Sequence, residues 1–425
     1  MIGIIGGGLT GLALAHYLAK RGVPHMVFEA EERPGGVIRS GRVEGHLLEW
    51  GPQRTRLVGS VGELVRELGL GDQVVTAPPG LPLFVYRRGR LRRVPFSAGD
   101  FVRSDLLSWP AKLRVLLEPF TRGPDDAEHV ADFFTRKLGR AAYEDLLGPL
   151  YGGLYASDPA DMVVGLSLGH VLREFGIGRS LLLPLLRRRG RISPPAACSF
   201  QEGMQTLPAA LYRHNQSNVR LGTPVQRLQG AGDGFRLQWD GGELNAEQIV
   251  IATSAPAAAR LLTEIAPDAA TRIGQLTYNP LAVVHLHAET ELVGLGYQVS
   301  LAERLSTRGV TFNDSLFGRR GVYTSYLGGA KDPQVVKRPD GEVAEIALRE
   351  FREVTGYDAR ALSVARERMP AWDRSWEALE GLQLPAGIHL AANWESRPGI
   401  PGRLAQAKRL ASLLSGGVPS GASQR

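Results

Sequence analysis

The first 30 residues, MIGIIGGGLTGLALAHYLAKRGVPHMVFEA, constrain the fold more than any other stretch of the chain. A short apolar run leads into a glycine turn with the spacing Gly6-x-Gly8-x-x-Gly11. Apolar residues at helical spacing follow as far as Gly22, and a second strand is expected over residues 25–30. This order of strand, glycine turn, helix and strand is typical of a parallel sheet that binds a dinucleotide.

Each part of this unit has a physical role in holding a pyrophosphate. The first glycine permits a tight turn, the second lets the backbone approach the phosphates, and the third lets helix and strand pack closely. The helix N-terminus directs partial positive charge at the phosphates. Glu29 ends the second expected strand, where it can accept hydrogen bonds from a ribose and disfavours the 2′-phosphate of NADP. We therefore expect nucleotide contacts from Gly6, Gly8, Leu9, Thr10, Gly11, Glu29 and Ala30.

Length and composition bound the class of protein. A chain of 425 residues is expected to form two or three domains. The single cysteine, Cys198, excludes an internal disulfide and a cysteine-rich metal site. His285 and His287 share a strand face without a third ligand, so we expect no metal. No apolar run reaches the roughly 18 residues that span a bilayer, and the N-terminal segment does not resemble a signal peptide, so we expect a cytoplasmic protein.

The net charge of +7 is concentrated in two basic clusters, over residues 86–95 and 185–192. No RNA- or DNA-binding signature accompanies them, so we do not expect nucleic acid as a partner. Anionic lipid, a polycarboxylate substrate and a merely solvated surface each remain compatible with the clusters.

Two further motifs follow the first unit. Arg33, Gly35 and Gly36 resemble the R-x-G-G element of the flavin amine oxidase superfamily. The stretch EWGP, which contains Gly51 and Pro52, resembles the E-x-G-P element that lies near the isoalloxazine ring in that superfamily. The resemblance implies FAD as the cofactor, and no second G-x-G-x-x-G is present for a separate nicotinamide nucleotide.

The resemblance continues through distant parts of the chain. IVIATSAP resembles the superfamily's A-T-G/A-T-P turn and includes Thr253, while Val225 corresponds to a backbone contact with adenine. The segment after an expected strand over 389–392 resembles the C-terminal flavin segment, with a helix expected from about Gly402. It departs from the usual pattern at Arg397 and Gly402. The cofactor residues implied by these segments are Val225, Thr253, Trp372, Asn393, Gly399 and Ile400.

The segments between these pieces resemble the protoporphyrinogen oxidase family. GGLYASDP is similar to its G-x-Y-A-G-D-P stretch, with Ser157 in place of a glycine. SFQEGMQTLP, FNDSLFGRRGVYTSYLGGA and RGRLRRVP resemble three more of its motifs, in the family's order. The resemblance implies substrate contacts from Arg92, Phe317, Arg56 and Tyr155, and Arg54 is a further candidate anion partner.

This resemblance implies an enzyme of haem biosynthesis that oxidises protoporphyrinogen IX or coproporphyrinogen III. Three hydride transfers to N5 of non-covalent FAD would remove six electrons, with O₂ or a quinone as acceptor and no catalytic protein dyad. A flavin amine oxidase on the same fold is the main alternative, although the expected strand over 280–289 lacks the lysine that many such enzymes carry. A carotenoid desaturase or isomerase and a non-catalytic FAD-binding scaffold are further alternatives.

The expected fold class is α/β. A Rossmann-like FAD-binding domain is assembled from residues 1–75, 200–256 and 380–418, an α+β substrate-binding domain from 76–95 and 257–379, and a helical, membrane-facing type of domain from 96–199. Residues 419–425 are expected to form a flexible tail. A ferrochelatase-type downstream enzyme and a peripheral membrane contact on the inner face of the membrane are candidate partners. The sequence leaves monomer and homodimer equally open.

Overall fold

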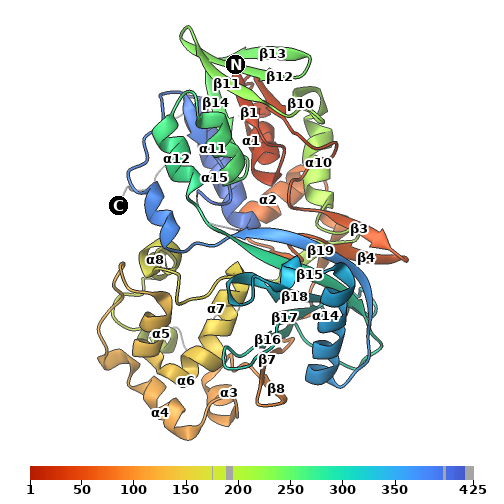
Figure 1. Ribbon diagram of the computed structural model, residues 1–425, viewed down its shortest axis with the longest axis vertical. Coiled ribbons are helices and arrows are strands. Elements are labelled where there is room, and N and C mark those ends of the chain that lie inside the picture. Colours follow the sequence, from red (N-terminus) through yellow and green to blue (C-terminus); the bar gives the residue numbers. More distant parts are fainter. Residues whose placement is uncertain (175, 188–194, 396–398, 417–425) are drawn as a thin grey trace.

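The computed structural model describes residues 1–174, 176–187, 195–395 and 399–416. In Figure 1 the upper part of the molecule contains the N-terminal strand, the lower right a large sheet with one long helix, and the lower left a group of helices. The mixed α/β fold class is confirmed. The tail predicted over 419–425, the position of Arg397 and most of the second basic cluster lie outside the described residues.

A five-stranded parallel sheet forms the centre of the upper part. Its order is β10-β2-β1-β14-β20, so the first strand of the chain lies in the middle. The strands that form it come from three stretches that are distant in sequence: β1 (Ile2–Ile5), β2 (His25–Phe28), β10 (Val219–Arg220), β14 (Gln248–Ile251) and β20 (Ile388–Leu390).

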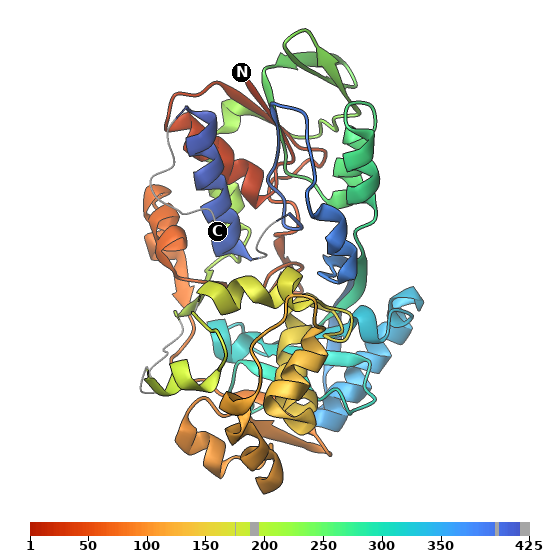
Figure 2. The same ribbon diagram turned by 90° about the vertical axis from the view of Figure 1, so that its left-hand side faces the viewer.

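Alternating side chains of this sheet divide the upper part into two apolar cores. Ile4 packs on one face against the helices, and Ile5 packs on the other face against α11, α12 and a three-stranded antiparallel sheet. Figure 2 shows the C-terminal helix α15 (blue) beside α1 (red). These elements are α1 (Leu9–Ala19), α2 (Gly59–Glu67), α10 (Thr206–His214), α11 (Ala255–Leu262), α12 (Pro267–Gly274), α15 (Ile400–Leu414), β11 (Arg227–Ala231), β12 (Gly234–Trp239) and β13 (Gly242–Ala246).

A seven-stranded sheet of order β19-β15-β18-β17-β16-β7-β8 forms the lower right part. The helix α14 (Asp340–Thr355) covers one face, where Val343 and Phe351 pack on Val284 and Tyr323. The opposite face contacts the helical region through Ala156. The strands are β7 (Leu83–Arg87), β8 (Arg90–Arg93), β15 (Tyr278–His287), β16 (Gly296–Val299), β17 (Thr307–Phe312), β18 (Val322–Gly328) and β19 (Arg360–Pro370).

Seven short α-helices are found in the lower left part among the residues that the structure describes. They are α3 (Ala98–Arg103), α4 (Trp109–Leu116), α5 (Val130–Leu138), α6 (Arg140–Ala142), α7 (Gly148–Tyr155), α8 (Gly169–Glu174) and α9 (Leu182–Arg187). Within the described ranges, no helix combines the length and hydropathy needed to cross a bilayer.

Two small sheets connect the parts. One is the hairpin of β3 (Ser40–Val43) and β4 (His46–Glu49). In the other, β9 (Ala197–Phe200) pairs with β5 (Thr55–Arg56) and β6 (Val74–Thr76), so the end of the stretch predicted as helical joins strands from the first segment.

Some predicted boundaries were wrong by one or two residues. The second strand ends at Phe28 rather than residue 30, and the strand expected over 389–392 is β20. The last helix begins at Ile400, ahead of the expected Gly402. Gly399 causes this earlier start, because its positive φ of 93° turns the chain directly into the helix.

Candidate functional site

The glycine turn after β1 is packed too tightly for any side chain at two of its positions. A Cβ on Gly6 would lie 2.8 Å from the carbonyl oxygen of Ala252, and Gly6 has a φ of +113°. A Cβ on Gly11 would lie 2.0 Å from the carbonyl oxygen of Gly6. These contacts hold the start of α1 against β1 and β14, so the helix N-terminus, with Leu9 and Thr10, opens at the carboxyl edge of the parallel sheet.

Glu29 lies at the same edge, directly after β2, and is almost completely buried. Its Oε2 accepts a hydrogen bond from the backbone N–H of Gly7 at 2.6 Å, and its Oε1 accepts one from Glu31 at 2.9 Å. The two bonds fix the carboxylate beside the glycine turn, and each oxygen keeps a lone pair for another donor. This arrangement suits recognition of a ribose diol.

A second glycine loop lies directly on the first. Gly8 forms a bridge with Gly35, and a Cβ on Gly36 would lie 3.2 Å from the Cα of Gly8. Arg33 donates to the carbonyl of Gly36 at 2.9 Å and forms an ion pair with Glu31 at 3.0 Å. The structure therefore brings together the two glycine motifs that the sequence predicted to hold one diphosphate.

The loop after β10 is attached to the same acidic corner. Thr223 donates its N–H to the carbonyl of Glu29 at 2.7 Å, and Gly222 donates to that of Glu31 at 3.0 Å. Val225 follows two residues later and is half-buried, whereas Ala30 is exposed. Val225 therefore lies just after a loop that is hydrogen-bonded to the backbone of Glu29 and Glu31.

The C-terminal segment approaches the end of β14. The indole of Trp394 donates to the carbonyl of Thr253 at 2.9 Å, and the indole of Trp376 donates to the carbonyl of Trp394 at 2.8 Å. Asn393 precedes Trp394 in the same turn and is half-buried. The N-terminus of α15, at Ile400, then opens near these turns and can stabilise negative charge on a bound group.

These residues fit FAD on structural grounds. Two glycine loops are in contact, a buried carboxylate is fixed beside them, and the N-termini of α1 and α15 both open toward the loops at the carboxyl edge of one sheet. No group of histidine, cysteine or carboxylate side chains that could hold a metal ion occurs among the residues that the structure describes.

Trp372 has a backbone conformation that bulky residues rarely adopt, with φ at +53°. Its ring is buried and stacks on Trp376 with centroids 5.3 Å apart. Tyr155, at the end of α7, belongs to the same apolar cluster, so two predicted site residues lie in one region. An observed strain of this kind marks a candidate functional position.

Ser157, which stands where the similar G-x-Y-A-G-D-P motif has a glycine, holds this region together. Its hydroxyl donates to the carbonyl of Ala371 at 2.6 Å and accepts from the amide of Asn279 at 2.8 Å. Burial raises the pKa of Tyr155 and also raises that of its neighbour Tyr151. The serine therefore ties the end of α7 to the strained segment around Trp372.

The EWGP element crosses the start of the large sheet. A Cβ on Gly51 would lie 1.9 Å from the carbonyl oxygen of Val37, so this turn is closed against the loop that follows Gly36. Gln53, directly after Pro52, is buried and accepts hydrogen bonds from Asn313 at 2.8 Å and Thr324 at 3.1 Å. Gln53 therefore ties the EWGP turn to α13 and β18. The next residue in the chain is Arg54.

Of the arginines proposed to bind an anion, Arg54 has the most suitable surroundings. Its side chain is half-buried and near Tyr326, and burial lowers its pKa. Within the described part of the chain, no ion pair or side-chain hydrogen bond is found for it. Burial and the charge of Arg54 shift the pKa of Tyr326 in opposite directions, and burial prevails, raising it to about 12.

Arg56 and Arg92 are placed differently. Arg56 is exposed and donates to the carbonyl of Pro195 at 2.8 Å. Arg92 is half-buried and already pairs with the carboxylate of Asp105. Burial, followed by repulsion from Arg87, lowers the pKa of Arg92. The charge of Arg56 also lowers the pKa of Arg54, so the two guanidinium groups are near each other, but that of Arg56 is exposed and bonded to Pro195.

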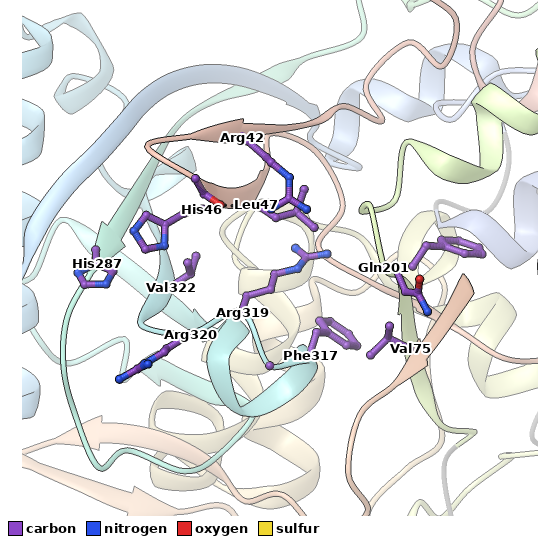
Figure 3. A pocket seen from close by; sticks show the side chains of 13 residues that line it. Arg42, His46, Leu47, Val75, Gln201, His287, Phe317, Arg319, Arg320 and Val322 are labelled. Carbon is purple, nitrogen blue, oxygen red and sulfur yellow. Dashed lines mark hydrogen bonds between the residues drawn. The ribbon is translucent and has the colours of Figure 1, made fainter. Parts of the chain in front are cut away.

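Phe317 lies in a different place from the other predicted substrate residues. It is the last residue of the short helix α13 (Asn313–Phe317) and lines a pocket of about 460 Å³ between the β3–β4 hairpin and the start of β18 (Figure 3). Neither Arg56, Arg92 nor Tyr155 lines this pocket. The structure therefore separates Phe317 from them.

Two residues of this neighbourhood were missed as sites in the sequence. Arg319 is buried and forms an ion pair with Glu49 at 2.7 Å, and its guanidinium also donates to Ser199 at 2.9 Å. Glu49 and Arg319 both stand inside recognised motifs, but only a neighbouring glycine or aromatic residue of each motif was predicted to be functional. The sequence did contain a sign of this pair: Glu49 stands in the EWGP motif and Arg319 in the FNDSLFGRR motif, so each recognised motif carries one charge of opposite sign.

Comparison with known proteins agrees with this geometry. The sequence matches the flavin containing amine oxidoreductase family over residues 9–402. It is 30% identical to the chloroplastic protoporphyrinogen oxidase of Oryza sativa, over 83% of this chain and 74% of that protein. It is 26% identical to the coproporphyrinogen III oxidase of Bacillus subtilis, over 83% of this chain and 82% of that protein.

Solved structures show the same fold. A crystal structure of a protein from Exiguobacterium sp. 255-15 superposes with a TM-score of 0.80 at 22% identity, covering 97% of this chain and 98% of that one. Putrescine oxidase bound to putrescine superposes with a TM-score of 0.71 at 16% identity, covering 97% of this chain and 98% of that one. With a family match that covers nearly the whole chain, this protein belongs to the flavin containing amine oxidoreductases.

Proposed function

We propose that this protein is an FAD-dependent oxidase that converts a porphyrinogen, protoporphyrinogen IX or coproporphyrinogen III, to the corresponding porphyrin. The observation that carries the proposal is the meeting of two segments that resemble porphyrinogen oxidase motifs, GGLYASDP and FNDSLFGRRGVYTSYLGGA, with the segment around Trp372. Ser157 donates to the carbonyl of Ala371, and Ala330 donates its N–H to the carbonyl of Ala156 at 2.9 Å. The names of the relatives from rice and Bacillus subtilis support the same substrate class.

When bound, FAD supplies the hydride acceptor, and the cofactor carries the difficult part of the chemistry. The chain's own residues would bind and orient the substrate and would exclude water from it. Trp372, Trp376 and Tyr155 form an apolar wall beside the end of α7. Such a wall holds an apolar ring system in a water-poor slot, which raises the effective concentration of the reacting groups.

Arg54 is the proposed anchor for a substrate carboxylate. A half-buried guanidinium without a carboxylate partner can pair with an anionic substituent of the substrate, which would compensate its charge. Arg92 would contribute to carboxylate binding at the edge of the seven-stranded sheet, where Asp105 competes with the substrate for its charge. Both proposed substrates carry propionates, so the two arginines favour an acidic macrocycle over an amine.

Parallel assays test the proposed function. The FAD-loaded protein is incubated under air with each porphyrinogen, and the red fluorescence of the porphyrin is recorded against a protein-free control, because porphyrinogens also oxidise spontaneously. Faster porphyrin formation with one substrate supports the proposal and identifies the physiological preference. Oxidation of putrescine with peroxide release, and none of either porphyrinogen, would instead establish the amine oxidase that the shared fold allows.

A peripheral membrane location is proposed from an apolar surface on the helical part. Outward-facing residues include Trp109 on α4, 63% exposed, and Phe120, 79% exposed. Lys112 lies over the ring of Trp109 at 4.6 Å but is buried and donates to backbone carbonyls, whereas Arg122 is exposed and provides a cation near the apolar surface. We define this apolar helical surface as Phe96, Val102, Trp109, Leu113, Leu116, Leu117 and Phe120.

Such a surface suits an anionic membrane, since apolar groups enter the interface while cations meet the headgroups. The protein would then act from the cytoplasmic side and deliver its product to a ferrochelatase-type enzyme. We propose non-covalent FAD for the same chain, because the C-terminal flavin segment contains no cysteine for attachment.

A further inference from the structure

The β7–β8 hairpin carries a cluster of arginines, most of which have no part in the cofactor or substrate sites described above. Residues 86–96 read YRRGRLRRVPF, with five arginines and no acidic residue. β8 is the last strand of the seven-stranded sheet, so among the described residues its outer edge has no neighbouring strand. In Figure 1 the hairpin lies with α3 and α4 at the lower end of the molecule, opposite the parallel sheet.

Two of the five arginines hold the hairpin on the helical part. Arg87 pairs with the buried Asp145 at 2.8 Å and donates to the carbonyl of Leu106 at 2.6 Å. Arg92 pairs with Asp105. Leu106 and Asp105 both lie in the turn after α3, so these contacts fix the hairpin beside that helix.

The other three, Arg88, Arg90 and Arg93, are exposed, and we call them the hairpin arginines. Their guanidinium groups form no ion pair and no hydrogen bond with any residue that the structure describes. By contrast, the exposed Arg227 pairs with a glutamate at 2.6 Å. The carboxylate of Glu303 accepts the backbone N–H of Arg88 at 2.6 Å, and one carboxylate against three guanidinium groups leaves a net positive charge.

The guanidinium groups of the hairpin are close enough to repel one another. After burial, the charges of neighbouring hairpin residues lower the pKa of Arg92, namely those of Arg87, Arg90 and Arg88. An anion at the surface of the hairpin would reduce this repulsion, and phosphate oxygens accept charge-assisted hydrogen bonds from arginine.

Exposed apolar side chains adjoin the hairpin arginines. Phe96 follows the hairpin and is 64% exposed, and Val102 on α3 is 53% exposed. Arg103, next to Val102, is also exposed and has no side-chain partner in the described part of the chain. Both apolar residues belong to the apolar helical surface defined above, so cations and apolar groups share one end of the molecule.

We propose that the hairpin arginines bind the phosphates of anionic lipids and orient the protein on the membrane, with the parallel sheet directed away from it. This inference rests on the peripheral membrane location proposed above and assigns the headgroup contact to named residues. Guanidinium groups suit this role because each can donate two parallel hydrogen bonds to a phosphate. A nucleic acid also offers phosphates, but it would leave Phe96 and Val102 in water, whereas a lipid interface covers them.

Co-sedimentation of the FAD-loaded protein with mixed phosphatidylglycerol and phosphatidylcholine vesicles tests the proposal. At about 0.1 M salt, the triple variant Arg88→Gln, Arg90→Gln and Arg93→Gln is expected to bind about tenfold more weakly than the wild type or worse, because three cations near the anionic surface are lost. The matched control replaces three other exposed arginines, Arg213→Gln, Arg349→Gln and Arg409→Gln, and is expected to stay within about twofold of the wild type.

Two further comparisons separate charge from a structural effect. The triple variant with lysine at the same three positions keeps the charges, so most of the binding should return. At about 1 M salt, where the Debye length is about 3 Å, the wild type and the glutamine variant are expected to bind equally. Vesicles of phosphatidylcholine alone should likewise not distinguish them.

Equal binding of the wild type and the glutamine variant at low salt would overturn the assignment to the hairpin arginines, while the apolar helical surface could still bind. Failure of the wild type to bind any vesicle would overturn both this inference and the membrane location. Release of the protein from the vesicles by RNA at equal phosphate concentration would identify nucleic acid as the partner and also overturn it. Because sedimentation measures no turnover, the result is independent of whether the protein oxidises porphyrinogens.

Discussion

Glu49 and Arg319 are 270 positions apart in the chain and form a buried ion pair with an N···O distance of 2.7 Å. The carboxylate also accepts hydrogen bonds from Ser40 at 2.5 Å and from the N–H of Met204 at 2.9 Å. The pair thus joins the hairpin before the EWGP turn, the start of α10 and the connection to β18. Burial raises the pKa of Glu49, and Arg319 lowers it.

Arg319→Met is expected to lower the free energy of unfolding by about 3–5 kcal/mol, because it leaves a buried carboxylate without its counter-charge. Urea unfolding followed by circular dichroism measures this loss. The double variant with Glu49→Gln is expected to recover part of it, since both charges are then gone. A loss below about 1 kcal/mol for Arg319→Met would mean that the pair does not matter for stability.

Gly11→Ala is expected to abolish FAD binding, because the new methyl would lie 2.0 Å from the carbonyl oxygen of Gly6. The flavin absorbance of the purified protein gives the occupancy. Gly59→Ala is the matched control, since nothing lies within 4 Å of a Cβ at that position of α2. Equal flavin content in the two variants would refute the assignment of the glycine turn to the cofactor.

Arg54→Gln is expected to raise KM for the porphyrinogen at least tenfold with little change in flavin content, because a charged hydrogen bond contributes about 1.5–3 kcal/mol. Arg56→Gln, two residues away on the exposed side of β5, is expected to leave KM within twofold. Steady-state kinetics with both variants distinguishes the contribution of Arg54 to KM from that of Arg56. An unchanged KM for Arg54→Gln would remove this residue from the substrate site.

Acid is expected to destabilise the fold through His285. This side chain is fully buried, its Nε2 donates to the carbonyl of Glu49 at 2.8 Å, and burial lowers its pKa to about 4. The unfolded chain takes up the proton near pH 6.5 while the folded one does not. Stability therefore falls as the pH drops from 6.5 to 4, by about 3 kcal/mol for this group.

His285→Gln keeps an N–H donor for Glu49 but does not titrate. Its free energy of unfolding should therefore decline less between pH 7 and pH 4 than that of the wild type. Parallel urea titrations at the two pH values measure the difference. Identical declines would show that His285 does not contribute to the acid sensitivity.

The apolar helical surface is expected to bind anionic vesicles. The double substitution Leu113→Ser and Phe120→Ser should reduce co-sedimentation with phosphatidylglycerol vesicles several-fold, because both side chains are exposed and each loses apolar area that enters the interface. Val293→Ser is the control, since this residue is 62% exposed but lies outside the helical part. Equal sedimentation of wild type and double variant would contradict the membrane proposal.

Much of the cofactor site was predictable from local sequence. The turn from Gly6 to Gly11 needs glycines for reasons of backbone geometry alone, and Glu29 follows at the end of the next strand. Because parallel strands end at one edge of a sheet, β1, β2 and β14 had to bring their loops together once they paired. The recurrence of family-like motifs along the chain predicted the segments that complete this edge.

The substrate side depended on the tertiary structure. Neighbouring arginines such as Arg54 and Arg56 look equivalent in sequence, and only the packing around Tyr326 and Pro195 gives them different surroundings. Phe317 was expected with Arg92, but at the end of α13 it lines a pocket that Arg92 does not line. Local motifs determine backbone turns, whereas side-chain burial and ion pairing between distant segments are decided only when those segments pack together.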